Sequence, residues 1–336
     1  MATQRRLFST FRCLQHDNPL GLPRSGTPPS FPRRRGLPEK RKIRDVKKVI
    51  AVSSAKGGVG KSTIAVNLAL AFARRGIRTG ILDTDIFGPS IPTLLNLSGE
   101  PRLDDHDRLI PLTNYGLKSM SMGYLLPPPP SPTPETPQHH SRAPMDTTPI
   151  SWRGLMVTKA MQQLLHSVSW GPLDVLFLDL PPGTGDVQLT IGQEIILDGA
   201  VIVTTPQDIA LRDAVRGFGM FQRMNVPVLG MVRNMAFFAC PECGTKTRIF
   251  SAGLHHHGHR HGRSDESADE RDWGVLAECK RLGVEFLGDI PLDARVCEDA
   301  DRGMPTVVSE EGGRSARREA FMGVAEKVAR KVGVEW

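Results

Sequence analysis

Two lysines and three glycines lie close together in the stretch Lys56–Thr63, which reads KGGVGKST. Glycines let the backbone bend so that its N–H groups converge on an anion, at the positive end of the helix that follows. A hydroxyl directly after the second lysine is a common ligand of phosphate-bound Mg²⁺. The stretch predicts a phosphate-binding loop, in which Lys61 faces the β- and γ-phosphates and Ser62 ligates Mg²⁺. The residues predicted to bind the nucleotide here are Lys56, Gly57, Gly58, Val59, Gly60, Lys61, Ser62 and Thr63.

The loop departs from the usual pattern G-x-x-x-x-G-K-[ST] at one position, where Ala55 replaces the first glycine. Alanine adds only a methyl group at the edge of the loop. We therefore expect nucleotide binding to be retained.

A phosphate-binding loop needs a strand before it and a helix after it, and the sequence supplies both. The run KVIAVSS ahead of the loop is typical of a strand, and apolar residues at helical spacing follow the loop as far as Gly76. Further apolar runs, such as DVLFLDLPP and GAVIVTTP, alternate with helical stretches. This alternation predicts an α/β fold with a mostly parallel central sheet and helices on both faces. We expect residues 45–333 to form one domain.

Two segments within that range do not fit the alternation. Residues 127–149 contain nine prolines, too many for a helix or an interior strand. Residues 252–272 are polar, show no periodicity and contain five histidines. Both segments are predicted to be surface insertions, and metal binding by the histidines stays open as an alternative.

Charge is divided unevenly along the chain. Residues 1–44 hold eleven lysines and arginines against two acids, whereas the other 292 residues hold 32 against 34. The first residues are rich in arginine and hydroxyls, with no acid before Asp17, which is the composition of a mitochondrial transit peptide. A disordered basic tail is the alternative. We predict a leader and linker over residues 1–44 and a location in the mitochondrial matrix.

The same charge distribution bears on partners. Because the positive charge belongs to the leader, the folded part is nearly neutral and no nucleic-acid partner is expected. No run of 18 apolar residues exists, so stable insertion into a membrane is not expected either, although peripheral contact stays possible.

The extra lysine of the loop, Lys56, carries a resemblance to a known class. KGGVGKST resembles the deviant Walker A motif of the SIMIBI-class P-loop ATPases, which include nitrogenase iron protein, the Min and Par partitioning ATPases and the Mrp-type iron–sulfur scaffolds. In that class the signature lysine reaches across a dimer, where a second cation offsets charge on the transferring phosphoryl group. The resemblance implies a homodimer that closes over ATP. A solvated loop lysine is the alternative.

The resemblance also implies roles for three residues at predicted strand ends. Asp85, in LDTDIFGP, matches the switch I aspartate that orients the attacking water, and Asp179, in FLDLPPGTGD, matches the Walker B carboxylate that holds Mg²⁺ through water. Asn234, in VRNM, matches the asparagine that reads the adenine ring, although asparagine is also common at strand ends. Lys56 and Asp85 would then be the catalytic residues. Asp83 is expected to be structural or to support the site indirectly.

Two cysteines, Cys240 and Cys243, lie in the motif CPECG. One CxxC supplies two thiolates, while zinc or a cubane cluster generally takes four ligands. Cys279 and Cys297, or the histidines, could complete a site within one chain, or two copies of CxxC could face each other across a two-fold axis. Mrp-type scaffolds are understood to hold a [4Fe–4S] cluster in the second way. Structural zinc in one chain is the alternative.

The segments around CPECG, such as LGVEFLGDIPLD and ADRGMPTV, closely resemble that subgroup, and the leader resembles its mitochondrial members, which serve assembly of respiratory complex I. The resemblance implies an ATP-dependent carrier that transfers [4Fe–4S] clusters to mitochondrial apo-proteins. Two rivals stay open: a zinc-binding module with a vestigial ATPase, and a partitioning ATPase acting at a membrane or on DNA. The membrane form of the latter would end in an exposed amphipathic helix, whereas we expect the apolar residues of the C-terminal stretch to pack on the sheet.

Overall fold

The computed structural model describes residues 40–85, 88–125, 154–240, 243, 245–250, 274–312 and 315–336. Residues 1–39 of the predicted leader and both predicted insertions, 127–149 and 252–272, lie outside the described residues. In the described part of the chain, no helix is both long and apolar enough to cross a membrane.

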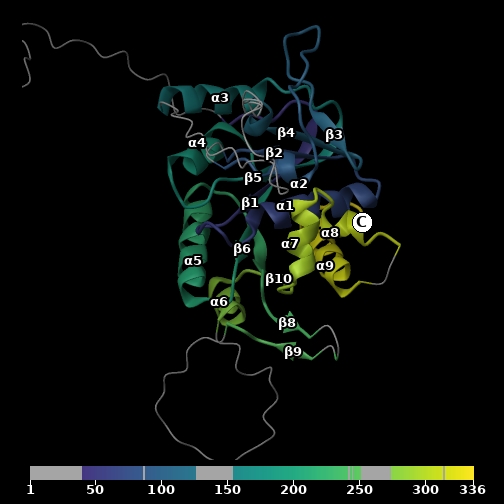
Figure 1. Cartoon of the computed structure of the whole chain (residues 1–336). Coiled ribbons are helices and arrows are strands. Elements are labelled where there is room, and N and C mark those ends of the chain that lie inside the picture. The colour runs from purple at the N-terminus through teal and green to yellow at the C-terminus, as the bar shows by residue number, and fades with distance from the viewer. Residues whose placement is uncertain are drawn as a thin grey trace, which may run out of the picture. The chain divides into compact units, whose positions relative to one another are not determined.

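An eight-stranded sheet in the order β10-β7-β6-β1-β5-β2-β4-β3 runs through the middle of the fold (Figure 1). Its paired strands are parallel, except that β3 is antiparallel to β4 at one edge. The predicted fold class, α/β with a mostly parallel sheet, is confirmed. The strands are β1 (Val46–Ser53), β2 (Thr79–Asp83), β3 (Leu112–Asn114), β4 (Leu117–Ser121), β5 (Leu173–Asp179), β6 (Gly199–Thr204), β7 (Val228–Arg233) and β10 (Phe286–Asp289).

Helices cover both faces of this sheet, and each face has its own apolar core. Helices α1, α2, α8 and α9 contribute buried residues to one core, and α3, α4, α5 and α6 contribute to the other. The helices are α1 (Lys61–Arg74), α2 (Ile91–Leu94), α3 (Gly154–His166), α4 (Asp186–Glu194), α5 (Asp208–Arg223), α6 (Val275–Leu282), α7 (Ala294–Asp301), α8 (Thr306–Ser309), α9 (Ala316–Val332) and the short 3₁₀ helix η1 (Met122–Tyr124).

The C-terminal helix α9 packs with its apolar stripe inward. Phe321 and Val328 are fully buried in the core that α9 shares with α1, and Val324 is nearly so. The helix ends at Val332 and is capped by Gly333, whose left-handed backbone (φ 69°) favours glycine. This is the packed final helix that we expected from the sequence, and it is not the exposed amphipathic helix of a membrane-bound partitioning ATPase.

The three central strands bring the candidate site residues together. Val52 on β1 and Asp83 on β2 both align with Asp179 on β5, the strand between them. The last residues of all three strands are buried, as near-continuous apolar runs predict for strands covered on both faces. Because parallel strands point the same way, the residues that follow them meet at one edge of the sheet.

Two features of the fold were not predicted from the sequence. One is the β3–β4 pair at the edge of the sheet, and the other is an antiparallel hairpin of β8 (Phe238–Ala239) and β9 (Lys246–Thr247). Most of these strands have only two or three residues, too few to show a hydrophobic period. The hairpin is anchored where the Leu292 N–H donates to the Phe237 carbonyl oxygen at 2.8 Å.

Candidate nucleotide site and cysteine hairpin

The predicted phosphate loop connects β1 to α1 and depends on glycine backbone geometry. Gly58 and Gly60 have φ angles of 78° and 80°, in the left-handed region that other residues rarely adopt. Gly60 is also the N-cap of α1, and a Cβ atom there would lie 2.3 Å from the Asn234 amide nitrogen. Glycine is therefore required at residue 60 both by the turn and by the close approach of β7's end.

Lys61 and Asp179 form a buried ion pair beneath the loop. The Lys61 side chain is 6% exposed and the Asp179 side chain is fully buried, and the Lys61 ammonium contacts Asp179 Oδ1. Burial raises the pKa of Asp179, and the charge of Lys61 opposes that rise. The contact of Lys61 with phosphates stays a prediction, and it would require Lys61 to exchange this carboxylate for phosphate oxygens.

The donor set at this position fits a magnesium ion. Asp179 Oδ2 is buried and has no hydrogen-bond partner in the described part of the chain. The Ser62 hydroxyl oxygen lies 3.3 Å from the Lys61 ammonium that contacts the same carboxylate. Carboxylate and hydroxyl oxygens are hard ligands of the kind that Mg²⁺ takes, usually together with water and phosphate oxygens. Ser62 and Asp179 are thus the residues that would hold the ion.

Asp83 is buried beside Asp179 and organises the neighbouring turn. Asp83 accepts hydrogen bonds from the Asp85 N–H (3.0 Å), the Ile91 N–H (3.3 Å) and the Ser121 hydroxyl (3.0 Å). Burial, followed by the charge of Asp179, raises the pKa of Asp83 to about 7. The structure gives Asp83 this supporting role, and it leaves the half-buried Asp85 with its predicted role in water activation untested.

Thr84 was not identified from the sequence, yet it joins two of the central strands. Its backbone N–H and its hydroxyl both donate to the Asp179 carbonyl oxygen, at 3.0 and 2.7 Å. No sequence signal distinguishes this threonine, because the contact depends on the pairing of β2 with β5.

Lys56 and Asn234 differ in what they contact within the described part of the chain. The Lys56 side chain is half-buried and forms no ion pair with any described residue. The Asn234 amide donates to the Val59 carbonyl oxygen at 2.8 Å, so it holds the loop backbone. The predicted role of Lys56 towards a partner's nucleotide and that of Asn234 towards adenine both stay predictions.

Cys240 and Cys243 lie between the two strands of the β8–β9 hairpin. Cys243 is exposed and Cys240 is half-buried. Cys243 Sγ lies 3.1 Å from the Thr245 hydroxyl oxygen, and hydrogen bonding with Thr245 and then with Cys240 lowers the pKa of the Cys243 thiol. A lowered pKa favours the thiolate, which is the form that ligates metals. Thr245 was not singled out from the sequence, since its role depends on the hairpin turn.

The other described cysteines do not join this pair. Cys279 is buried on α6, where burial raises the pKa of its thiol to about 11, and Cys297 is exposed on α7. Within the described ranges, no group of three or more histidine, cysteine, aspartate or glutamate side chains could hold a metal ion. The described residues of one chain therefore offer two thiols at the hairpin.

Comparison with known proteins identifies the family. The family model described as ParA, NUBPL iron-transfer P-loop NTPase, matches residues 45–133 and 139–329. The chain belongs to this family. A mouse relative of the NUBPL family, named iron-sulfur cluster transfer protein NUBPL, is 44% identical over 300 residues, which cover 89% of this chain and 82% of the relative.

Two further relatives extend the family's range. An Arabidopsis thaliana protein named iron-sulfur protein required for NADH dehydrogenase, mitochondrial, is 39% identical over 86% of this chain and 80% of its own length. An iron-sulfur cluster carrier protein of Aquifex aeolicus is 42% identical over 87% of this chain and 70% of its own length. The resemblance to Mrp-type scaffolds that the motifs indicated is thereby confirmed.

Solved structures agree with the fold. A nucleotide-binding protein of Archaeoglobus fulgidus in complex with ADP is 33% identical and covers 78% of this chain and 89% of its own, with a TM-score of 0.60. The septum site-determining protein MinD of Pyrococcus horikoshii, complexed with Mg-ADP, is 19% identical with a TM-score of 0.56, over 85% of this chain and 98% of its own. The second likeness concerns the fold alone.

Proposed function

We propose that this chain is an ATP-dependent carrier that binds an iron–sulfur cluster and transfers it to apo-proteins. The observation that carries the proposal is the presence, in one domain, of a phosphate loop over a buried lysine–aspartate pair and of a cysteine pair whose exposed member, Cys243, has a lowered thiol pKa. The names of the mouse and Aquifex aeolicus relatives support the same function.

The cargo that fits best is a [4Fe–4S] cluster held between two copies of the chain. Cys240 and Cys243 supply two thiolates, half of what a cubane cluster takes. A two-fold axis through the cluster would supply the other half without any further ligand. Such a shared site opens when the two chains move apart, which suits a carrier that must release its cargo.

Nucleotide would control that pairing of chains. Lys61 would leave Asp179 for the phosphates, Ser62 and Asp179 would hold Mg²⁺, and Asn234 would lie near the adenine. Magnesium supplies charge neutralisation at the phosphates. Lys56 would reach the nucleotide of the second chain and Asp85 would orient a water, so hydrolysis is expected to be slow until the dimer closes.

The recipients are proposed to be mitochondrial apo-proteins, including subunits of respiratory complex I. The name of the Arabidopsis relative, which links it to NADH dehydrogenase and to the mitochondrion, supports this assignment. The basic leader of residues 1–44 supports import into the matrix. A fusion of residues 1–44 to a reporter should enter mitochondria, and cytosolic retention of the fusion would contradict the location.

Anaerobic reconstitution tests the cargo. Protein reconstituted with iron and sulfide should hold about four irons and about four sulfides per pair of chains, and should elute as a dimer. Zinc bound by single chains, at about one ion per chain, would instead indicate the structural zinc site that the sequence left open.

The role of Lys56 can be separated from that of the loop as a whole. Lys56→Ala should leave ATP affinity within about threefold, because the side chain is not part of the buried pair, and should slow hydrolysis by about tenfold or more. Isothermal titration and phosphate release measure the two quantities. Unchanged turnover in this variant would remove the proposed action across the dimer.

A further inference from the structure

A cavity of about 960 Å³ lies beside the cysteine hairpin. The hairpin contributes Phe237, Ala239 and Lys246 to its lining. The other lining residues come from the end of β10 and the start of α7, from the end of α8 and from the beginning of α9, and they include Arg295 and Arg317. No residue of the phosphate loop lines this cavity, so it is a separate place on the molecule, and Cys240 directly follows a lining residue.

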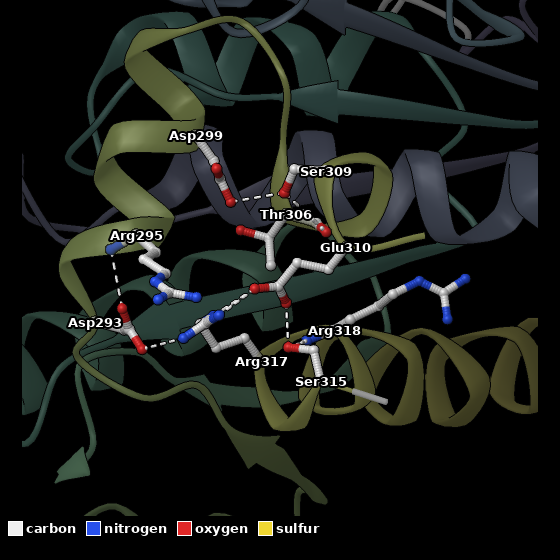
Figure 2. A network of polar contacts seen from close by, with 9 residues as sticks. All are labelled: Asp293, Arg295, Asp299, Thr306, Ser309, Glu310, Ser315, Arg317 and Arg318. Atoms are coloured by element: carbon white, nitrogen blue, oxygen red, sulfur yellow. Dashed lines mark hydrogen bonds and ion pairs between the residues drawn. The ribbon is translucent and has the colours of Figure 1, made fainter. Parts of the chain in front are cut away.

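The wall formed by α7, α8 and α9 is held in place by Arg317 (Figure 2). The Arg317 guanidinium donates to Asp293 at 2.6 Å and to Glu310, and the Ser315 hydroxyl donates to the same Glu310. Asp293 also accepts the Arg295 N–H at 2.9 Å, which caps the start of α7. These bonds fix the positions of three helices relative to one another, so the cavity has a preformed wall.

The carboxylates around the cavity are already engaged by arginines. Asp289 accepts two hydrogen bonds from Arg233, at 2.6 and 2.9 Å, and Glu311 pairs with Arg74 at 3.1 Å. Although partial burial acts in the opposite direction, the hydrogen bond from Arg317 lowers the pKa of Asp293, so this carboxylate stays ionised and paired. Acidic groups on the wall are therefore not free to bind a cationic ligand.

Two cations of the lining lack an ion-pair partner among the described residues, although the charge of Arg295 adds to the lowering of the Asp293 pKa. Lys246 and Arg295 form no ion pair with any carboxylate in the described part of the chain. The Lys246 ammonium lies 4.8 Å from the centre of the Phe237 ring, and Arg295 is exposed at the first turn of α7. The lining also includes apolar residues, such as Pro291 and Ala320. The described lining of the cavity thus offers one unpaired cation from the hairpin and one from α7, beside carboxylates that arginines already hold.

We propose that this cavity docks an acidic, partly apolar peptide segment of the protein that receives the cluster. The inference rests on the proposed carrier function, because it places the recipient next to Cys240. Carboxylates of such a segment would gain charge-assisted hydrogen bonds from Lys246 and Arg295. A concave, preformed cavity at the upper end of the size range of ligand sites can accept an extended peptide.

Binding of a defined probe tests the proposal in the full-length protein without a cluster. The probe is a labelled peptide that alternates glutamate with leucine, and the reference probe replaces each glutamate with lysine. Fluorescence anisotropy should show binding of the acidic probe only, and weaker binding as salt is added. Arg295→Ala and Lys246→Met should each reduce affinity about fivefold or more. Arg302→Ala, which removes the same charge just beyond the other end of α7, should reduce it less than twofold.

Cluster loading of the same variants separates this inference from the proposed function. Arg295→Ala and Lys246→Met should load iron and sulfide as the unsubstituted protein does. Three outcomes would overturn the docking site and leave the carrier function standing. They are equal binding of the acidic and the lysine probe, unchanged affinity for the acidic probe in both variants, and binding to vesicles of anionic lipid as tight as binding to the acidic probe. Failure of the unsubstituted protein to load iron and sulfide would overturn the carrier function, while selective binding of the acidic probe would still support an acidic docking segment.

Discussion

The phosphate loop and the cysteine hairpin differ in how completely the single chain builds them. Around the loop, Lys61 and Asp179 are buried and bonded to each other, and Asp83 accepts three hydrogen bonds from its surroundings. At the hairpin, Cys243 is exposed, and its described side-chain hydrogen bonds are with Thr245 and Cys240, which lie within three residues of it. A site that binds the same ligand in every cycle benefits from preorganisation, whereas a site that must surrender its cargo benefits from ligands that one chain leaves incomplete.

The largest expected effect is that substitutions in the two regions impair different activities: cluster loading at the hairpin and ATP binding at the loop. Cys240→Ser should abolish cluster loading and leave ATP affinity unchanged, because the hairpin contributes nothing to the buried pair. Lys61→Ala should lower ATP affinity by about 100-fold and leave the thiols able to load iron. Iron and sulfide analysis, together with titration calorimetry, measures both. Cys297→Ser, on the exposed face of α7, is the matched control and should change neither quantity.

The preorganisation of the loop can be broken at Gly60. Gly60→Ala combines a positive φ with a contact of 2.3 Å to Asn234, so it should lower the free energy of unfolding by about 2 kcal/mol or more and weaken ATP binding. Gly76→Ala has nearly the same φ, 79°, but open space, and so reports the backbone strain alone. Adding Asn234→Ala should restore part of the loss caused by Gly60→Ala. No restoration in this double variant would mean that the contact carries no cost.

Asp83 predicts a pH dependence of the stability of the fold around the loop. Its pKa of about 7 in the folded chain lies above the ordinary value of 3.8, so the folded state keeps a proton that the unfolded state releases. Between those two pH values the free energy of unfolding should therefore fall as pH rises, by about 1.4 kcal/mol per unit from this group, and it should level off above pH 7. Urea unfolding at several pH values should show a flatter profile for Asp83→Asn. The same slope in both proteins would contradict the assignment.

The smallest effect concerns Thr245. Thr245→Val removes the hydroxyl that lies 3.1 Å from Cys243 Sγ, so the pKa of that thiol should rise and its alkylation by iodoacetamide near neutral pH should slow about threefold. Mass spectrometry resolves alkylation at Cys243 from that at the other cysteines. The exposed Cys297 should react at the same rate in both proteins, and an unchanged rate at Cys243 would exclude the hydroxyl as the cause.

Much of the geometry of the candidate nucleotide site could be predicted from the sequence because its residues follow buried strands. The glycine run and Asp179 lie directly after β1 and at the end of β5, so the fold class alone brings them together. The pairing of Lys61 with Asp179 and that of Asn234 with Val59 could not be predicted, since each joins residues more than a hundred positions apart. The hairpin turn was also missed, because two-residue strands carry no period.

The docking cavity could not be predicted from the sequence at all, because its contacts also join residues of different elements. Arg317 meets Asp293 and Glu310 only after α7, α8 and α9 have folded against one another, and the sequence shows three ordinary charged residues. Spacing along the chain predicts sites that are built from one strand and its loop. It does not predict surfaces that several helices assemble.

The Asn234 amide that holds the Val59 carbonyl belongs to the end of β7, and the chain runs from there directly into β8 and Cys240. At most about 20 Å of extended backbone separates Asn234 from that thiol. If nucleotide binding changes the affinity of the cysteines for a cluster along this path, cluster binding must change the affinity for nucleotide by the same factor, since coupling between two ligands is reciprocal. A cluster that binds more tightly when ATP is present would therefore raise the affinity for ATP by the same factor, so a loaded chain and an empty chain would compete unequally for the same nucleotide pool.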